Sequence, residues 1–287
     1  MDNALVVKQL SKVYSNFELK NISFEIPKGK IMGLVGENGA GKSTTINGIL
    51  DLIKPDYGEV RFWGQQLTNN HKLKEDIGVV FDEVNFYETL TPKKVGNIAK
   101  NAYTKWDMEL YRKYIKRFDI PEDKEIKTLS KGTKMKLCIA VAMSHNPKLL
   151  ILDEATSGLD PIVRNDVLEV FLEFVRDTEN SILISSHITT DLEKVADYIT
   201  FIHNGKLLFC NSKSELLNKY GIIQCRQNEF DLIDKNDILA CRKENSQWQI
   251  LVANKKIAEN KYNLNIENTT LEDILLLLGN CETSSQS

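Results

Sequence analysis

The sequence predicts an α/β fold built around a parallel sheet, because two short apolar stretches each lead into residues that carry chemistry. Residues 31–35 are apolar and are followed by a glycine-rich turn and then by an amphipathic stretch, residues 45–53, in the order strand, turn and helix. Residues 148–154, KLLILDE, are apolar until they end in two carboxylates. Such unbroken apolar character is typical of a strand buried on both faces of a parallel sheet.

The glycine-rich turn, GENGAGKST at residues 36–44, has the composition of a phosphate-binding loop. Its glycines permit backbone angles that other residues resist, so successive N–H groups can point at phosphate oxygens. The N-terminus of the following helix adds a positive partial charge. Lys42 supplies a mobile cation for the β- and γ-phosphates, and the hydroxyl of Ser43 suits Mg²⁺. The nucleotide-binding residues expected here are Gly36, Asn38, Gly39, Ala40, Gly41, Lys42, Ser43 and Thr44.

The two acids that end the second apolar run are expected to complete this site. In open α/β sheets, ligands bind at the carboxyl ends of the strands. Asp153 is therefore placed to hold Mg²⁺ through a water molecule, and Glu154 is placed to polarise an attacking water. An apolar strand that ends in acid is by itself an ordinary strand boundary, and it is the phosphate loop that gives these two carboxylates their meaning.

A phosphate loop and an acidic strand end are shared by kinases, GTPases and many ATPases, and three further segments distinguish among them. The sequence LSKGT at residues 129–133 opens a helix, ATSGLDP at 155–161 follows the two acids, and an apolar strand from residue 182 ends in Ser-Ser-His at 185–187. With these segments the chain, over about residues 5–221, resembles the ATP-binding cassette (ABC) family. In that family the corresponding elements are the Walker A loop, the signature, the Walker B strand, the D-loop and the switch histidine.

The resemblance implies a role for each matching residue, with ATP and Mg²⁺ as the ligands. Tyr14 is expected to stack on adenine, although a tyrosine in a strand is also an ordinary structural residue. Ser130 and Gly132 are expected to reach the γ-phosphate held by a second cassette, and Asp160 to lie across the contact between the two. His187 is expected to contact the γ-phosphate and to orient the water beside the catalytic Glu154.

Two departures from the family pattern stand out. The signature has Lys131 and Thr133 where the common LSGGQ form has glycine and glutamine. The strand at residues 77–81 is followed by Asp82, where the family places a glutamine that touches Mg²⁺ and reports the nucleotide state to the membrane partner. A carboxylate ligates Mg²⁺ at least as well as an amide does, so we expect Asp82 to join Ser43 and Asp153 as a metal ligand. The alternative is a plain acid at the end of a strand.

The rest of the first domain, residues 1–221, follows from local patterns. Residues 5–7, 22–26 and 60–63 predict strands of an N-terminal antiparallel β subdomain. Thr91 followed by Pro92 predicts a helix start, and helical spacing over 95–103 and 108–118 predicts a helical subdomain inserted at about residues 88–145. A helix is expected from Asp160 to about residue 177, and the pair Asn204-Gly205 predicts a hairpin between strands 199–202 and 206–209. A short helix over 211–220 closes the domain.

Residues 222–280 predict a small α+β domain, which the resemblance does not cover. Residues 222–226 suit a strand, 238–242 and 248–252 a hairpin, and 254–262 a helix. A capping box at residues 269–272 opens a last helix that is apolar on all sides near its end, which predicts burial on more than one side. The domain either packs on its own core or contributes this helix to a dimer contact. Residues 281–287 are expected to form a disordered tail.

Composition limits the possible partners. The net charge of −3 argues against a nucleic-acid partner, and the chain has no apolar run of membrane-spanning length. Its N-terminus lacks the pattern of a signal peptide, and its five widely spaced cysteines suit reduced thiols. The resemblance therefore implies an ATP-hydrolysing transporter subunit at the cytoplasmic face of the membrane, paired with a second cassette and a separate permease. Peptide, antibiotic or lipid export is expected, and a soluble ABC ATPase that acts on ribosomes or DNA is the alternative.

Overall fold

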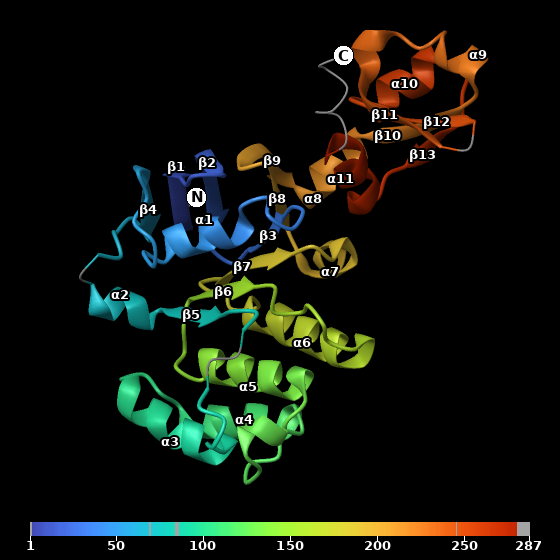
Figure 1. Cartoon of the computed structure of the whole chain (residues 1–287). Helices are drawn as coiled ribbons and strands as arrows, with labels where there is room; N and C mark the ends of the chain where they lie inside the picture. Colours follow the sequence, from blue (N-terminus) through green and yellow to red (C-terminus); the bar gives the residue numbers. More distant parts are fainter. Residues whose placement is uncertain (1, 69, 84–85, 245, 280–287) are drawn as a thin grey trace. The chain divides into compact units, whose positions relative to one another are not determined.

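The computed structural model of the chain describes residues 2–68, 70–83, 86–244 and 246–279. It consists of two compact units, Met1–Phe209 and Cys210–Ser287 (Figure 1). The sequence predicts a boundary after residue 221, whereas the second unit of the structure begins at Cys210. The short helix α8 (Lys213–Lys219) therefore belongs to the second unit. None of the described helices is long and apolar enough to cross a membrane. The predicted tail, residues 281–287, lies outside the described residues.

The first unit is organised by a nine-stranded sheet in the order β4-β1-β2-β9-β8-β3-β7-β6-β5. One end is antiparallel, as expected for the N-terminal β subdomain, and consists of β1 (Asn3–Val13), β2 (Glu18–Pro27) and β4 (Tyr57–Phe62). The other end is parallel and consists of β3 (Ile31–Val35), β5 (Ile77–Val80), β6 (Leu149–Asp153), β7 (Ser181–Ser186) and β8 (Tyr198–His203). The remaining strand, β9 (Lys206–Ser212), pairs with β2 in parallel.

The predicted parallel core is confirmed, because every residue of β3, β6 and β7 is buried. The register brings the carboxyl ends of these strands together: Val35 pairs with Ser186, and Asp153 pairs with Ser185. The segments that follow the three strands therefore meet at one edge of the sheet, which is where ligands bind in this architecture.

Helices cover the sheet and form the inserted helical segment. The helices beside the sheet are α1 (Lys42–Ile49), α2 (His71–Glu75), α6 (Pro161–Phe174) and α7 (Thr189–Val195). The inserted segment comprises α3 (Pro92–Ala102), α4 (Met108–Arg117), the 3₁₀ turn η1 (Ile126–Thr128) and α5 (Lys131–Met143), which lie together in Figure 1. Thr91 caps α3 as predicted, since its hydroxyl oxygen accepts a hydrogen bond from the Lys94 N–H. The Tyr111 hydroxyl joins α4 to α3 by donating to the Pro92 carbonyl at 2.7 Å.

The predicted hairpin between β8 and β9 is confirmed. Asn204 and Gly205 both have positive φ, 47° and 73°, which is the conformation of a tight turn between paired strands. A Cβ on Gly205 would lie 1.9 Å from the Glu18 carbonyl oxygen, so this turn packs directly on the second strand of the sheet. The Gly205 N–H donates to the Ala40 carbonyl at 3.0 Å, and the hairpin thus supports the glycine-rich loop.

The second unit has its own four-stranded sheet in the order β11-β12-β10-β13. Its elements are β10 (Gly221–Cys225), α9 (Gln227–Phe230), η2 (Lys235–Asp237), β11 (Ile238–Glu244), β12 (Gln247–Val252), α10 (Lys255–Lys261), β13 (Ile266–Asn268) and α11 (Leu271–Gly279). A core that includes Ile223, Ile250 and Val252 lies within this unit, and Trp248 stacks on Phe230 at a centroid distance of 4.1 Å.

Helix α11 differs from its prediction in the position of its cap. Its cap is Thr270, whose backbone N–H donates to the Asp273 carboxylate while its hydroxyl oxygen accepts from the Asp273 N–H. The capping box thus lies one residue after the predicted one. Leu271, Ile274, Leu275 and Leu277 are buried, as expected for a helix with so many apolar residues, whereas the side chain of Leu276 is 43% exposed.

Candidate active site

The glycine-rich loop joins β3 to α1 and takes backbone conformations that require glycine. Gly39 and Gly41 have φ of 82° and 112°, in the left-handed region. A Cβ on Gly36 would lie 2.3 Å from the carbonyl oxygen of Ile202, so no side chain fits there. Gly41 serves as the N-cap of α1 without any side chain that could satisfy the first N–H groups, which are left available to an anion.

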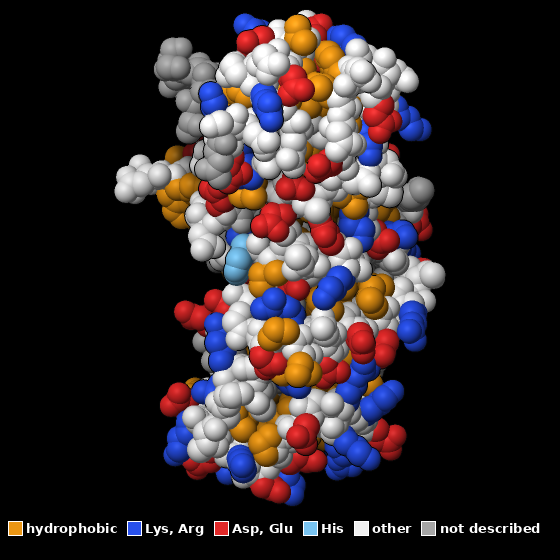
Figure 2. All heavy atoms as spheres, turned by 90° about the vertical axis from the view of Figure 1, so that its right-hand side faces the viewer, with side chains coloured by type: hydrophobic (Ala, Val, Ile, Leu, Met, Phe, Trp, Pro, Cys, Tyr) orange, Lys and Arg blue, Asp and Glu red, His pale blue; other side chains and the backbone are white. Residues whose placement is uncertain are grey.

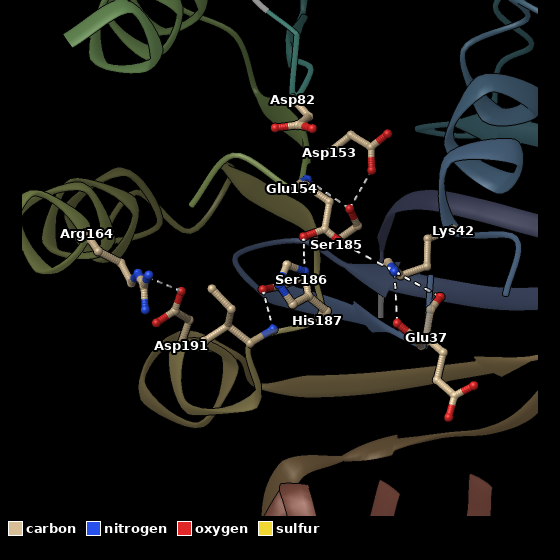
Figure 3. Close-up of polar contacts among 12 residues, drawn as sticks. Glu37, Lys42, Asp82, Asp153, Glu154, Arg164, Ser185, Ser186, His187 and Asp191 are labelled. Atoms are coloured by element: carbon tan, nitrogen blue, oxygen red, sulfur yellow. Dashed lines mark hydrogen bonds and ion pairs between the residues drawn. The ribbon is translucent and has the colours of Figure 1, made fainter. Parts of the chain in front are cut away.

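Lys42 lies beneath this loop and is only 6% exposed. Its Nζ donates to the Gly36 carbonyl at 2.8 Å and to the Glu37 carbonyl at 3.3 Å, and it forms an ion pair with Glu154 Oε1 at 3.2 Å (Figure 3). A buried ammonium group is thus held by two carbonyls and one carboxylate close to the free end of α1. This is a cation placed to receive phosphate oxygens.

Glu154 links Lys42 to His187. Its other oxygen, Oε2, lies 2.7 Å from His187 Nδ1. A carboxylate accepts and does not donate, so this ring nitrogen carries the proton of the bond when the glutamate is ionised. Glu154 has φ of 53°, a backbone conformation that is uncommon for a residue with a side chain. Lys42, Glu154 and His187 come from three different elements, and the structure brings these three predicted residues together.

Ser185 holds the two acids in place and was not predicted as a site residue. Its hydroxyl donates to Asp153 Oδ1 at 2.6 Å and accepts from the Glu154 N–H at 3.0 Å. The side chain is fully buried. The sequence offers one signal for this role, because Ser185 stands at the end of an apolar strand, as Asp153 does. In the structure the two strands are neighbours, and Ser185 and Asp153 pair in register.

A cavity of about 530 Å³ lies between the glycine-rich loop and these acids. It is lined by Phe17, Glu37, Asn38, Gly39, Gly41, Lys42, Ser43, Thr44, Asp82, Asp153 and Glu154. Nine of the predicted residues therefore meet in one cavity, and Phe17 and Glu37 are additions. The three residues expected to bind Mg²⁺ are among them and offer a hydroxyl and two carboxylates, the hard oxygen donors that this ion prefers.

Phe17 is the aromatic residue that lines the cavity, whereas Tyr14, the predicted one, is not among the lining residues. The two rings are neighbours, with centroids 6.4 Å apart, and the Tyr14 side chain is 44% exposed. Phe17 lies in the turn between β1 and β2, and a Cβ on Gly41 would approach its ring to 3.0 Å. The assignment of Tyr14 to adenine stays a prediction.

The signature residues and Asp160 lie away from this cavity. Ser130 caps α5, since its Oγ accepts from the Thr133 N–H at 3.1 Å. Gly132 is open on one side, where an added Cβ would meet only Leu159 and the Ser130 hydroxyl. Asp160 caps α6 by accepting from the N–H groups of Ile162 and Val163. Within this chain, these three residues make no contribution to the cavity that holds Lys42.

A partly buried ion pair joins the segments that follow Glu154 and His187. Arg164 Nη2 donates to the Leu159 carbonyl at 2.9 Å, and its Nε lies 3.8 Å from Asp191 Oδ2 (Figure 3). Asp191 is only 1% exposed, and burial raises the pKa of its carboxyl above the usual value. Arg164 thus connects the loop that follows Glu154 to the helix that follows His187.

A second cavity, of about 520 Å³, lies beside β5 and α5. Val79, Phe81, Tyr103 and Cys138 are among its lining residues, and Phe81 and Glu83, on either side of Asp82, both line it. Burial raises the pKa of the Cys138 thiol to about 12, so the thiol stays protonated and unreactive and serves only to line the cavity. This second cavity, called the groove beside β5 below, therefore lies next to Asp82, one of the proposed metal ligands.

Known proteins resemble this chain in both sequence and fold. A sequence model described as ABC transporter matches residues 19–157. The ABC transporter ATP-binding protein YtrB of Bacillus subtilis is 35% identical over 219 residues, which cover 76% of this chain and 75% of that protein. The bacitracin transport ATP-binding protein BcrA of Enterococcus faecalis is 33% identical over 244 residues, 82% of this chain and 76% of that one. Among solved structures, cbiO1 from Clostridium perfringens, part of the ABC transporter complex cbiONQ, has a TM-score of 0.65 and 28% identity, covering 75% of this chain and 91% of that one.

Proposed function

The chain belongs to the ABC transporter family, and from this premise we propose that it is the ATP-hydrolysing subunit of an exporter whose membrane-spanning permease is a separate chain. The observation that carries the proposal is the series Lys42–Glu154–His187 at the edge of a cavity rich in carboxylates. The similarity to a bacitracin transport protein favours a peptide or antibiotic as the cargo, with lipid as a further candidate.

The reaction follows from the charges of this series. Lys42 stabilises charge on the β- and γ-phosphates, and doing so releases Glu154 from its ion pair. Glu154 then accepts a proton from the attacking water, and the His187 N–H holds the carboxylate in place. Ser43, Asp82 and Asp153 would hold Mg²⁺, which when bound neutralises phosphate charge.

We propose that the site is completed by a second cassette. Ser130, Gly132 and Asp160 belong to the family's ATPase machinery by resemblance, yet they lie outside the cavity of their own chain. Ser130 opens the 13-residue helix α5, whose N-terminus favours an anion. A second copy of this chain, or a related cassette, would present these groups to the γ-phosphate.

The groove beside β5 is the proposed contact with the permease. It is lined by apolar and aromatic side chains together with charged and histidine side chains, and it adjoins Asp82, so a permease segment seated there would sense the metal site. This contact would place the chain at the cytoplasmic face of the membrane. Figure 2 shows acidic and basic side chains mixed over one face of the described chain, a distribution unlike the basic stripe of nucleic-acid-binding proteins. Co-purification of a membrane protein after gentle detergent extraction tests the assignment.

Two substitutions test the ATPase site. Lys42→Ala should strongly weaken both ATP binding and turnover, because it removes the main phosphate cation. Glu154→Gln should retain ATP binding and slow hydrolysis by roughly 10²-fold or more, the scale of a lost general base. It should also let ATP hold two cassettes together, which size-exclusion chromatography would detect. Glu169→Gln, at an exposed glutamate of α6, is the matched control and should hydrolyse ATP as the unmodified chain does.

The outcomes separate the parts of the proposal. Wild-type turnover in Lys42→Ala would reject the phosphate-loop assignment. Wild-type turnover in Glu154→Gln would reject Glu154 as the base while leaving nucleotide binding in place. A monomer at every ATP and protein concentration would count against the second cassette.

A further inference from the structure

Two of the residues at which this chain departs from the family pattern, Asp82 and Lys131, form an ion pair. Lys131 Nζ lies 3.4 Å from Asp82 Oδ1. Asp82 follows β5, and Lys131 is the first residue of α5, so the ion pair joins the end of a core strand to the start of a helix in the inserted segment. The side chains are 58% and 51% exposed for Lys131 and Asp82, and the contact is therefore one that water and ions can reach.

An acidic neighbour stabilises Lys131 because of the place of this lysine in the helix. A positive charge at the first residue of a helix faces the positive end of the helix dipole, which is unfavourable. The first turn of α5 contains no acidic residue that would offset this charge. Asp82 supplies the missing carboxylate from outside the helix, so the lysine in the signature and the acid after β5 are physically matched.

The stem of Lys131 also crosses the loop that follows Glu154. A Cβ on Gly158 would lie 3.4 Å from Lys131 Nζ and 3.7 Å from its Cδ and Cε. The ion pair therefore spans three segments that the proposed reaction uses, namely the end of β5, the loop between Glu154 and Asp160, and the start of α5.

Asp82 has a second use, because it lines the phosphate cavity with Asp153 and Ser43. We propose that Lys131 competes with the divalent cation for the Asp82 carboxylate, so that the ion pair forms in the empty site and opens as the cation enters with the nucleotide. Opening releases the start of α5, next to Ser130, from the end of β5. This inference rests on the proposed role of Asp82 as a metal ligand. Because exposed ion pairs are weak, the competition is expected to change the metal affinity by about two- to fivefold.

The test is a titration with Mn²⁺, followed by its electron paramagnetic resonance, on the full chain saturated with the non-hydrolysable analogue AMP-PNP. Lys131→Met removes the competing charge and should lower the Mn²⁺ dissociation constant about two- to fivefold. Lys131→Arg keeps the charge and should bind as the unmodified chain does. Lys127→Met is the matched control, because Lys127 is a similarly exposed lysine that pairs with Glu125 just before α5.

The decisive comparison repeats Lys131→Met in an Asp82→Asn background. Competition for Asp82 predicts no effect of Lys131→Met there, whereas simple repulsion of the metal by the lysine predicts the same gain in both backgrounds and would overturn the inference. If Lys131→Met does not raise the Mn²⁺ affinity of the chain that retains Asp82, the inference is likewise overturned. If Asp82→Asn alone leaves Mn²⁺ affinity unchanged, Asp82 is no metal ligand and the inference is rejected while the ATPase assignment stands. Failure of the unmodified chain to bind AMP-PNP would reject the proposed function itself.

Discussion

Arg164→Met should destabilise the first unit by an amount that depends on pH. The substitution keeps an apolar stem in place of the arginine stem but leaves the Asp191 carboxylate, which is 1% exposed, without its ion-pair partner. Removing one partner of a fully buried ion pair costs about 3–5 kcal/mol, and the 24% exposure of Arg164 and the separation of 3.8 Å place this loss at about 2–3 kcal/mol. Domains of this kind are stable by only about 5–15 kcal/mol, so the expected loss is a large part of the total.

The pH dependence follows from the sign of the pKa shift. Burial already raises the pKa of Asp191, and loss of Arg164 raises it further, so the folded chain binds the proton more tightly than the unfolded chain does. Stability is then greatest below the unfolded pKa and falls as pH rises through the folded pKa, by up to about 1.4 kcal/mol per pH unit. The deficit of Arg164→Met relative to the unmodified chain should therefore be largest at pH 8 and shrink toward pH 5.

Urea denaturation at these two pH values measures the effect. Tryptophan fluorescence in a Trp248→Phe background reports the first unit, because Trp63 and Trp106 both belong to it. In an Asp191→Asn background the deficit should fall to about 1 kcal/mol, the value of the lost hydrogen bond to the Leu159 carbonyl. A deficit that is equal at both pH values, or equal in both backgrounds, would refute the reasoning.

Three further results are expected. Ser185→Ala should lower stability by about 1.5–3 kcal/mol, since it removes a buried hydrogen bond to the Asp153 carboxylate, and it should also slow turnover; unchanged values in urea denaturation and ATPase assays would contradict this. Burial lowers the pKa of His145 below its ordinary 6.5, so its contribution to stability is present above pH 6.5 and is lost as the pH falls toward the folded pKa; His145→Gln should flatten thermal stability between pH 7 and 5, and an unchanged slope would exclude this role. Removal of residues 222–287 should leave nucleotide binding intact in a fluorescence titration, because every residue lining the phosphate cavity precedes residue 210, and loss of binding by a folded truncation would show that the second unit completes the site.

Much of the candidate site could be predicted because its chemistry is written in local sequence. The glycine-rich loop, the acids after β6 and His187 after β7 each follow an apolar strand, and parallel strands bring their carboxyl ends to one edge. Contacts between distant segments could not be predicted. Phe17 reaches the cavity from a turn at the antiparallel end of the sheet, and the pairing of Lys131 with Asp82 depends on how the inserted helices pack on the core.

In the second unit, too, local sequence predicts the strands but does not fix every detail of the last helix. The hairpin of β11 and β12 was predicted from its strand patterns, and the pairing of the two strands confirms it. The start of α11 could not be fixed, because Thr269 and Thr270 are each followed three residues later by an acid, and only the structure shows that Thr270 and Asp273 are the pair that forms. The exposure of Leu276 likewise depends on which side of the helix the small sheet covers.

The hairpin of Asn204 and Gly205 has a consequence for the order in which the protein is made. The glycine-rich loop leaves the ribosome early, but its support comes from Gly205 and Ile202, and β3 lies between β7 and β8 in the sheet. Contacts of such long sequence separation form slowly, and domains assemble as units during synthesis. A nascent chain that already contains every glycine of the loop therefore still lacks a finished phosphate site until the segment around residue 205 has emerged and paired.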